Sequence, residues 1–192
     1  MSTDRIVEAA TRLFAERGYE GASTRLIAEA AGLNIATVSY HVGGKRELYL
    51  AVMERAHLAE RAALEGAMEV FTPDRAGIHL LLDRYLDFCV ERPEVPALWM
   101  RRWLSEADDV TSLEAEYVRP LIQQVVALVE DVAGPGTDLE FAVWTVIWSI
   151  HGFGRGGVLD PEGRRCRTDD PDALARFRAH LHVLADRLLG LA

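Results

Sequence analysis

The residues best suited to chemistry lie between positions 35 and 41, where small, hydroxyl-bearing and aromatic side chains follow one another. On a helix that begins near Asn34, the outward side would carry methyl groups, hydroxyls and one imidazole, with no acidic residue. Methyl groups can contact the thymine methyl and hydroxyls can bond to phosphates or base edges, whereas a carboxylate would be repelled by the DNA backbone. The outward residues are Ile35, Ala36, Thr37, Ser39, Tyr40 and His41. This composition favours DNA recognition.

A second short helix precedes this one. Thr24 can cap a helix whose apolar positions Ile27, Ala28 and Ala31 share one face, and Gly32 tolerates the positive φ of a helix end. The small alanines would allow two helices to cross closely. The two segments together predict a helix-turn-helix, in which the second helix enters the major groove.

Lys45 is the only lysine in the chain, and it stands at the expected start of the next helix. Its charge could reach a DNA phosphate from there. Each of these residues, taken singly, could equally belong to an ordinary solvated helix face. Their combination with the turn makes DNA binding the better interpretation.

Residues 5 to 55 resemble the N-terminal domain of the TetR family of transcriptional repressors. The resemblance rests on nineteen spaced positions, namely Ile6, Ala9, Ala10, Leu13, Phe14, Gly18, Tyr19, Ser23, Thr24, Ile27, Ala28, Ala31, Gly32, Thr37, Tyr40, His41, Lys45, Glu47 and Leu48. Two positions depart from the family pattern, since Ser39 replaces a frequent aromatic residue and Val42 a frequent Phe. Beyond residue 57 the resemblance is architectural.

The resemblance implies a three-helix DNA-binding head and assigns roles within it. Tyr40, His41 and Lys45 match positions that usually contact phosphates. A second group, Arg25, Ile35, Ala36, Thr37 and Ser39, matches positions that often face the bases. With Thr24 at the start of the first short helix, these residues form the expected DNA-binding set.

Length, charge and composition agree with a DNA-binding head on a larger body. The chain has 192 residues, 49% hydrophobic, and a formal net charge of −9. Residues 1–57 hold seven basic and seven acidic side chains, so the acidity lies in the remainder. A neutral head can still bind DNA through a local patch, with affinity that depends strongly on salt.

No targeting or membrane segment is apparent from the sequence. The N-terminal residues are charged and lead directly into an amphipathic helix, and no segment is apolar enough to span a bilayer. Cys89 and Cys166 are too few for a disulfide framework. We expect a cytoplasmic protein with reduced thiols and no membrane partner.

Helical periodicity continues along the whole chain, so we expect an all-α fold of about nine helices. The domains expected are a helix-turn-helix domain at 1–50 and a helical ligand-binding and dimerisation domain at 51–192. A first helix over 4–17, with Gly18 as its stop, would support the motif, and a long helix over 45–68 would link the two domains. Further helices are expected up to Cys89, around 98–104, from a cap at Asp138 to beyond 151, and from 171 to 189, with a solvated loop over 154–170. A helix is also expected over 112–132, with a bend at Pro120 and most of its sides buried.

Aromatic and polar side chains on four body helices could line a ligand pocket. Each lies on or beside the apolar stripe of its helix, so the helices could bring them to one interior volume. The candidates are Tyr85, Cys89, Trp99, Met100, Trp103, Tyr117, Trp148 and His151. Core packing is the alternative role for each.

The last two helices carry more apolar surface than one neighbour would cover. In the family such helices pair into a four-helix dimer interface, and a two-fold dimer suits two half-sites on palindromic DNA. The interface candidates are Trp144, Ile147, Phe177, Leu181, Leu184 and Leu188. The alternative is that these helices only close the core of the monomer.

Catalytic and metal-binding patterns are missing from the sequence. We find no Gly-rich phosphate loop, no Cys-x-x-Cys and no His-Glu-x-x-His, and His180 and His182 would point in different directions on a helix. We expect no enzyme activity, cofactor or metal. The sequence is best interpreted as a homodimeric repressor released from operator DNA by a small hydrophobic effector. A constitutive DNA-binding regulator, or a helical enzyme or carrier with an accessory DNA-binding domain, stays open.

Overall fold

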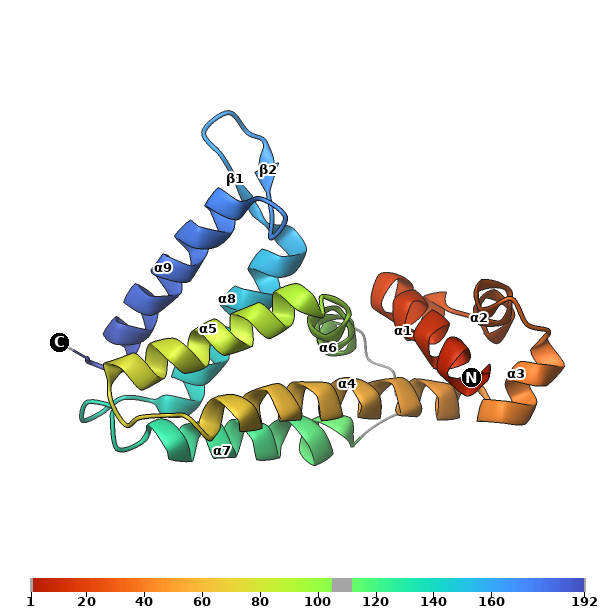
Figure 1. Ribbon diagram of the computed structural model, residues 1–192, viewed down its shortest axis with the longest axis horizontal. Coiled ribbons are helices and arrows are strands. Elements are labelled where there is room, and N and C mark those ends of the chain that lie inside the picture. Colours follow the sequence, from red (N-terminus) through yellow and green to blue (C-terminus); the bar gives the residue numbers. More distant parts are fainter. Residues whose placement is uncertain (1, 105–111, 192) are drawn as a thin grey trace. The chain divides into compact units, whose positions relative to one another are not determined.

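The computed structural model describes residues 2–104 and 112–191, and the fold is all-α (Figure 1). Contacts divide the chain into two compact units. The first comprises Met1–Ala59 with Glu94–Glu114, and the second comprises Glu60–Pro93 with Ala115–Ala192. The expected domain boundary after residue 50 rests on function and stays a prediction, since units defined by contacts need not coincide with functional domains.

The first unit is built on α1 (Ser2–Gly21), which packs against α2 (Thr24–Ala31), α3 (Ile35–Val42) and α6 (Glu94–Leu104). The first part of α4 (Lys45–Met68) completes it. Its fully buried side chains include Ile6, Phe14, Ile27, Val38 and Leu48. Along α1 the buried residues Ile6, Ala10 and Phe14 follow one another at intervals of four, which is why one face of this helix is buried.

Local capping explains the turn between α2 and α3. Gly32 ends α2 with φ 66°, and the Oδ1 of Asn34 accepts a hydrogen bond of 2.7 Å from the backbone N–H of Thr37. One expectation was wrong: the N-cap of α2 is Ser23, whose Oγ accepts from the N–H of Leu26, while Thr24 is the first helical residue. Ser is as good a cap as Thr, so composition alone could not separate the two.

The first helix is longer than expected. It reaches Gly21, but Gly18 leaves the helical conformation with φ 73° and ψ 177°. The stop predicted at Gly18 is therefore a kink, after which one more turn carries Tyr19 and Glu20.

The second unit contains α5 (Arg75–Glu91), α7 (Arg119–Val129), α8 (Leu139–Gly156) and α9 (Pro171–Leu188), with the end of α4. Helix α5 packs against α8 and α9, and α7 packs against α8. Aspartate side chains cap three of these helices, from Asp74, Asp138 and Asp170. Carboxylates suit these places because they accept the free N–H groups and complement the helix dipole.

The region over 112–132 differs from its expectation in two ways. A π-helical turn, η1 (Glu114–Val118), precedes α7, and Pro120 lies in the first turn of α7 rather than at a bend within one helix. Only Leu121, Ile122 and Val129 of α7 are buried, so this helix is less enclosed than its apolar sequence indicated.

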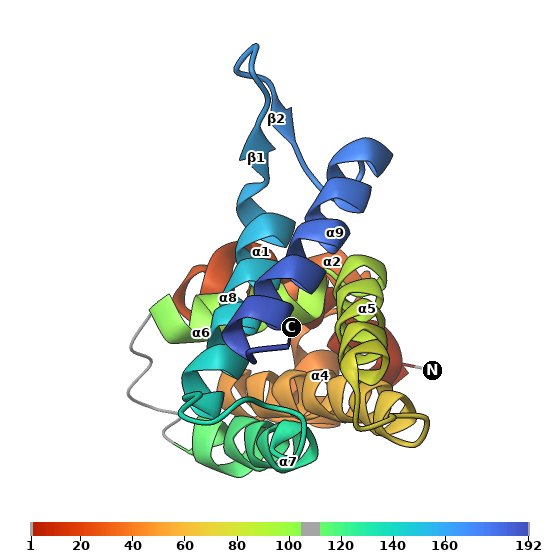
Figure 2. The same ribbon diagram turned by 90° about the vertical axis from the view of Figure 1, so that its left-hand side faces the viewer.

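A short antiparallel hairpin joins α8 to α9 where only a loop was expected. Its strands are β1 (Val158–Leu159) and β2 (Arg165–Cys166), and they project from the ends of the two helices (Figures 1 and 2). Gly157 permits the close approach of the strands: it has φ 66°, and a Cβ there would lie 2.3 Å from the carbonyl oxygen of Cys166. Asp160 closes the turn by pairing with Arg164 at 2.7 Å. Within the described residues, no helix is long and apolar enough to cross a membrane.

Candidate functional site

The outer face of α3 presents the side chains expected to contact DNA. Ile35, Ala36, Ser39, Tyr40 and His41 are exposed, and Tyr40 retains 86% of its accessible surface. Val38 is the buried residue of α3, so this one side chain anchors the helix to the core. The exposed face carries no carboxylate and is free to meet an anionic partner.

Three further members of the DNA-binding set lie beside this face. Arg25 on α2 is exposed, whereas Thr24 and Thr37 are half-buried. The hydroxyl of Thr37 donates a hydrogen bond of 2.9 Å to Asn34 Oδ1. Its proton is committed to the cap, so toward a base edge the Thr37 oxygen can act as an acceptor.

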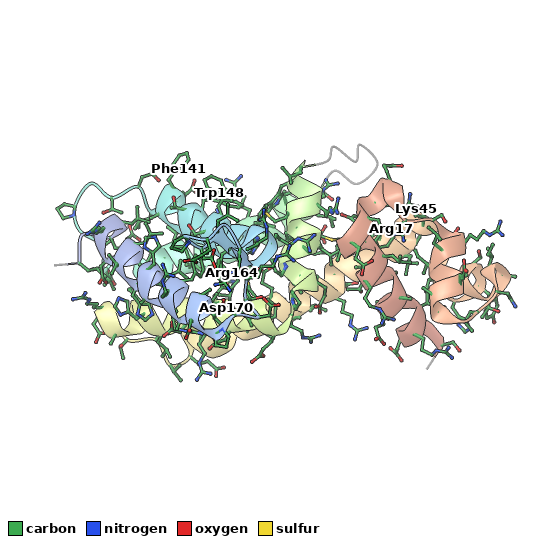
Figure 3. The ribbon with its side chains drawn as sticks, turned by 90° about the horizontal axis from the view of Figure 1, so that it is seen from above. Arg17, Lys45, Phe141, Trp148, Arg164 and Asp170 are labelled. Atoms are coloured by element: carbon green, nitrogen blue, oxygen red, sulfur yellow. The ribbon has the colours of Figure 1, made fainter. Side chains whose placement is uncertain are left out.

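Lys45, the last member of the set, is held by contacts from α1. Its Nζ lies 4.3 Å from the centre of the Tyr19 ring and 4.0 Å from Oε2 of Glu20. Lys45 is the first residue of α4, and Glu47 in the same turn accepts a hydrogen bond from the N–H of Gly44. Figure 3 shows Lys45 among the side chains of the first unit. The nine residues thus lie on α2, on α3 and at the first residue of α4.

Three of the expected ligand-pocket residues meet in the interior of the second unit. The hydroxyl of Tyr85 on α5 lies 2.9 Å from Nε2 of His151 on α8, and Cys89 follows Tyr85 by one helical turn. All three are buried. Glu60 on α4 joins them, since Tyr85 donates a hydrogen bond of 2.8 Å to its Oε1.

Sequence reasoning missed Glu60, although a signal was present. Glu60 lies four residues after Ala56 and four before Leu64, both buried, so it falls on the apolar stripe of α4. A charged residue on such a stripe is rarely buried without a partner. Here Tyr85 is a partner of this carboxylate.

The surroundings of this polar cluster control its protonation. Burial lowers the pKa of His151 to about 4, so the imidazole is neutral near pH 7. Because the proton of Tyr85 goes to Glu60, Nε2 of neutral His151 acts as the donor to the Tyr85 oxygen. Burial and the nearby Glu60 carboxylate raise the pKa of both Tyr85 and Cys89. The cluster offers hydrogen-bonding groups without a reactive thiolate.

The other pocket candidates lie elsewhere in the fold. Trp99, Met100 and Trp103 are on α6 in the first unit, where Trp99 and Trp103 stack with centroids 6.3 Å apart. Tyr117 is half-buried in η1. Trp148 is 50% exposed, so it belongs to the surface of its unit rather than to its interior. The expected convergence of the whole set stays a prediction, and the structure groups Tyr85, Cys89 and His151.

The exposed face of α8 carries large aromatic side chains. Phe141 is 64% exposed, and Trp144 stacks on Trp148 with centroids 5.7 Å apart. Figure 3 shows Phe141 and Trp148 on the outside of this helix. Ile147, an interface candidate, is half-buried. Apolar surface of this size on one helix is typical of an association surface.

The α9 candidates for the dimer interface are less accessible than expected. Leu181 is 1% exposed and belongs to the core of the second unit, and Phe177 stacks on Phe153 with centroids 4.1 Å apart. Leu184 and Leu188 are half-buried. The periodicity correctly placed these residues on an apolar stripe, but part of that stripe is covered by the same protomer.

The described part of the chain contains no group of three or more His, Cys, Asp or Glu side chains that could hold a metal ion. The geometry instead defines a helical protein with a helix-turn-helix whose second helix faces outward. Residues 6–52 match the model of the family described as bacterial regulatory proteins, tetR family. The N-terminal part of this chain, which contains the helix-turn-helix of α2 and α3, is therefore similar to the TetR family.

Comparisons with individual proteins agree with this assignment. Over 71 residues the chain is 41% identical to the HTH-type transcriptional repressor AcnR of Corynebacterium efficiens, which covers 36% of this chain and 38% of that protein. Over 42 residues it is 45% identical to the probable HTH-type transcriptional regulator YttP of Bacillus subtilis, covering 22% of this chain and 20% of that protein. The matched part of the chain thus spans 38% of the length of AcnR and 20% of the length of YttP.

The whole fold resembles solved structures at low sequence identity. A TetR-like transcriptional regulator from Rhodococcus sp. RHA1 matches with a TM-score of 0.73 and 19% identity, over 100% of this chain and 97% of that one. The fatty acid degradation regulator FadR from Bacillus halodurans matches with a TM-score of 0.74 and 16% identity, over 99% and 96%. These likenesses show that the whole chain, including the second unit, has the same fold as these structures.

Proposed function

We propose that this chain is a transcriptional regulator that binds palindromic operator DNA as a homodimer and represses transcription from it. The observation that carries the proposal is the outward face of α3, which is fixed by the Asn34 cap and free of carboxylates. A helix held in this way can enter the major groove without repulsion. Match to the family over residues 6–52 supports the same function.

The exposed aromatic face of α8 supports the dimer. Contact with a second copy would remove the apolar surface of Phe141, Trp144 and Trp148 from water, which is favourable. A two-fold dimer presents two copies of α3, and each would read one half-site.

The polar cluster in the second unit supports an effector site for a small, largely hydrophobic ligand. Tyr85, His151 and Glu60 supply a few hydrogen-bonding groups within apolar surroundings, the composition usual for ligand sites. Such a ligand would release the operator if it binds the DNA-free state more tightly, and DNA must then weaken ligand binding by the same factor. A constitutive regulator without a ligand is the alternative.

Selection of genomic fragments bound by the purified protein tests the function. We expect recovery of inverted repeats, and titration should show one dimer for each pair of half-sites. A tryptophan-quenching screen of hydrophobic compounds then tests the effector. Failure to enrich any sequence would contradict the repressor proposal. An enriched operator whose affinity no compound alters would leave the constitutive regulator.

A further inference from the structure

Lys45 is partly enclosed by Tyr19 and Glu20, which contact the same ammonium group that would bind a DNA phosphate. The Lys45 side chain is 26% exposed, whereas that of Glu20 is 84% exposed. The Lys45 side chain is therefore mostly covered by the protein, whereas the Glu20 carboxylate, 4.0 Å from the ammonium, is exposed to solvent.

The ring beneath the ammonium is fixed. Tyr19 is buried, and its ring packs edge-on against Tyr49 with centroids 4.9 Å apart and stacks near Phe14 at 6.1 Å. A cation over such a ring is attracted by the π face. Lys45 consequently has a defined place, since α4 fixes its backbone and Tyr19 its ammonium.

Glu20 lies in the last turn of α1, after the kink at Gly18. The ion pair between Glu20 and Lys45 is weak, because the carboxylate is exposed to solvent and lies 4.0 Å from the ammonium. Another anion can therefore replace the Glu20 carboxylate beside Lys45 at little cost in free energy. DNA offers one, because a phosphate oxygen can accept from the same ammonium group.

We propose that the Glu20 carboxylate occupies, in the DNA-free protein, the place on Lys45 that a DNA phosphate takes in the complex. Glu20 is then a positioning residue and an internal competitor, which holds the ammonium ready and lowers affinity for every DNA sequence. This inference rests on the proposed function, in which Lys45 contacts a phosphate.

The exchange has a signature in the salt dependence of binding. When a phosphate replaces Glu20, DNA releases a counterion but the freed carboxylate attracts a cation from solution. The wild-type protein therefore gains less from counterion release than a protein without Glu20. Glu20→Gln should tighten binding about two- to fivefold and steepen the logarithmic salt slope by up to about one.

The test is fluorescence anisotropy of full-length protein with a random-sequence duplex over a series of salt concentrations. Glu20→Asp, which shortens the side chain, should fall between the wild type and Glu20→Gln. Glu8→Gln is a matched control, since Glu8 also lies on α1 and also pairs with a basic side chain at 4.0 Å, in its case that of Arg12. We expect no change of affinity or salt slope from this control.

A double-mutant cycle separates competition for Lys45 from the loss of one negative charge. In a Lys45→Ala background, Glu20→Gln should no longer tighten binding. An equal gain in that background, or no gain in the wild-type background, would overturn the inference while DNA binding itself stands. A wild-type protein that binds no duplex at low salt would overturn both the inference and the proposed function.

Discussion

His79 on α5 and His182 on α9 stack their imidazole rings with centroids 4.1 Å apart and planes 8° apart. Each ring also meets an aspartate of the opposite helix, with Nε2 of His79 at 2.8 Å from Asp186 and Nε2 of His182 at 2.8 Å from Asp83. Arg75 pairs with Asp186 as well. One side of α9 is thus fastened to α5 by reciprocal polar contacts within the protomer.

Asp186 should make the free energy of unfolding of the second unit fall at acidic pH. Burial alone would raise the pKa of Asp186, but hydrogen bonds from Arg75 and His79 outweigh it and leave the pKa below its usual value. The ionised form therefore stabilises the fold above the unfolded-state pKa, near 3.9, and this contribution is lost as pH falls through the folded-state pKa. Urea unfolding between pH 6 and pH 3 should show a smaller acid loss in Asp186→Asn than in the wild type. Asp131→Asn, at an exposed aspartate, serves as control and should keep the wild-type profile.

His151 should act in a different pH window. Its pKa is about 4 in the folded state because of burial, against about 6.5 when unfolded. Between these values the unfolded chain binds more protons, so the free energy of unfolding falls as pH drops from about 6.5 to about 4, by at most about 3 kcal/mol. His151→Gln should flatten this part of the profile, whereas His180→Gln at an exposed position should not. A slope unchanged in His151→Gln would show that the imidazole is not buried in its neutral form.

Mutations should distinguish residues that contact DNA phosphates from residues that contact base edges. Lys45→Ala and Tyr40→Phe should weaken operator and random DNA alike, with the salt slope reduced by at most about one for the lysine. Arg25→Ala and Thr37→Ala should cost about 1 to 3 kcal/mol mainly on the operator. Anisotropy titrations on both duplexes measure the difference. Equal losses on every sequence for Arg25→Ala would rule out a base-reading role.

Charge on the aromatic face of α8 should dissociate the dimer. Trp148→Asp places a carboxylate where a second copy would exclude water, so sedimentation should detect monomers at concentrations at which the wild type is dimeric. Val70→Asp changes another exposed apolar residue and should leave the dimer intact. Leu181→Asp should instead lower stability, because that side chain lies in the protomer core. A wild-type protein that sediments as a monomer at micromolar concentration would contradict the homodimer.

Local signals in the sequence predicted much of the fold. Gly32 and Asn34 mark the turn between α2 and α3, and Asp138 stands at the N-cap of α8, because capping depends on residues only three positions apart. The recognition face could be predicted for the same reason, since helical periodicity decides which side chains share a side.

Long-range packing explains what could not be predicted. Leu181 and Trp148 both lie on apolar stripes, yet one is buried in its unit and the other is exposed, because neighbouring helices decide which side is covered. Glu60 acquires its role only when Tyr85 on another helix approaches it. The hairpin after α8 has strands of two residues, too short for any alternation of polar and apolar residues to register.

Gly157 has a consequence for genetics. Any side chain at this position would collide with the carbonyl of Cys166 and would also face an unfavourable φ. A saturation library selected for loss of repression should therefore enrich nearly every substitution at Gly157, alanine included. If only the loss of repression is scored, substitutions at the base of the hairpin would appear as damaging as substitutions on the exposed face of α3. Cellular abundance of the variants distinguishes the two, because Gly157 variants should be degraded while Arg25 and Tyr40 variants accumulate as folded protein.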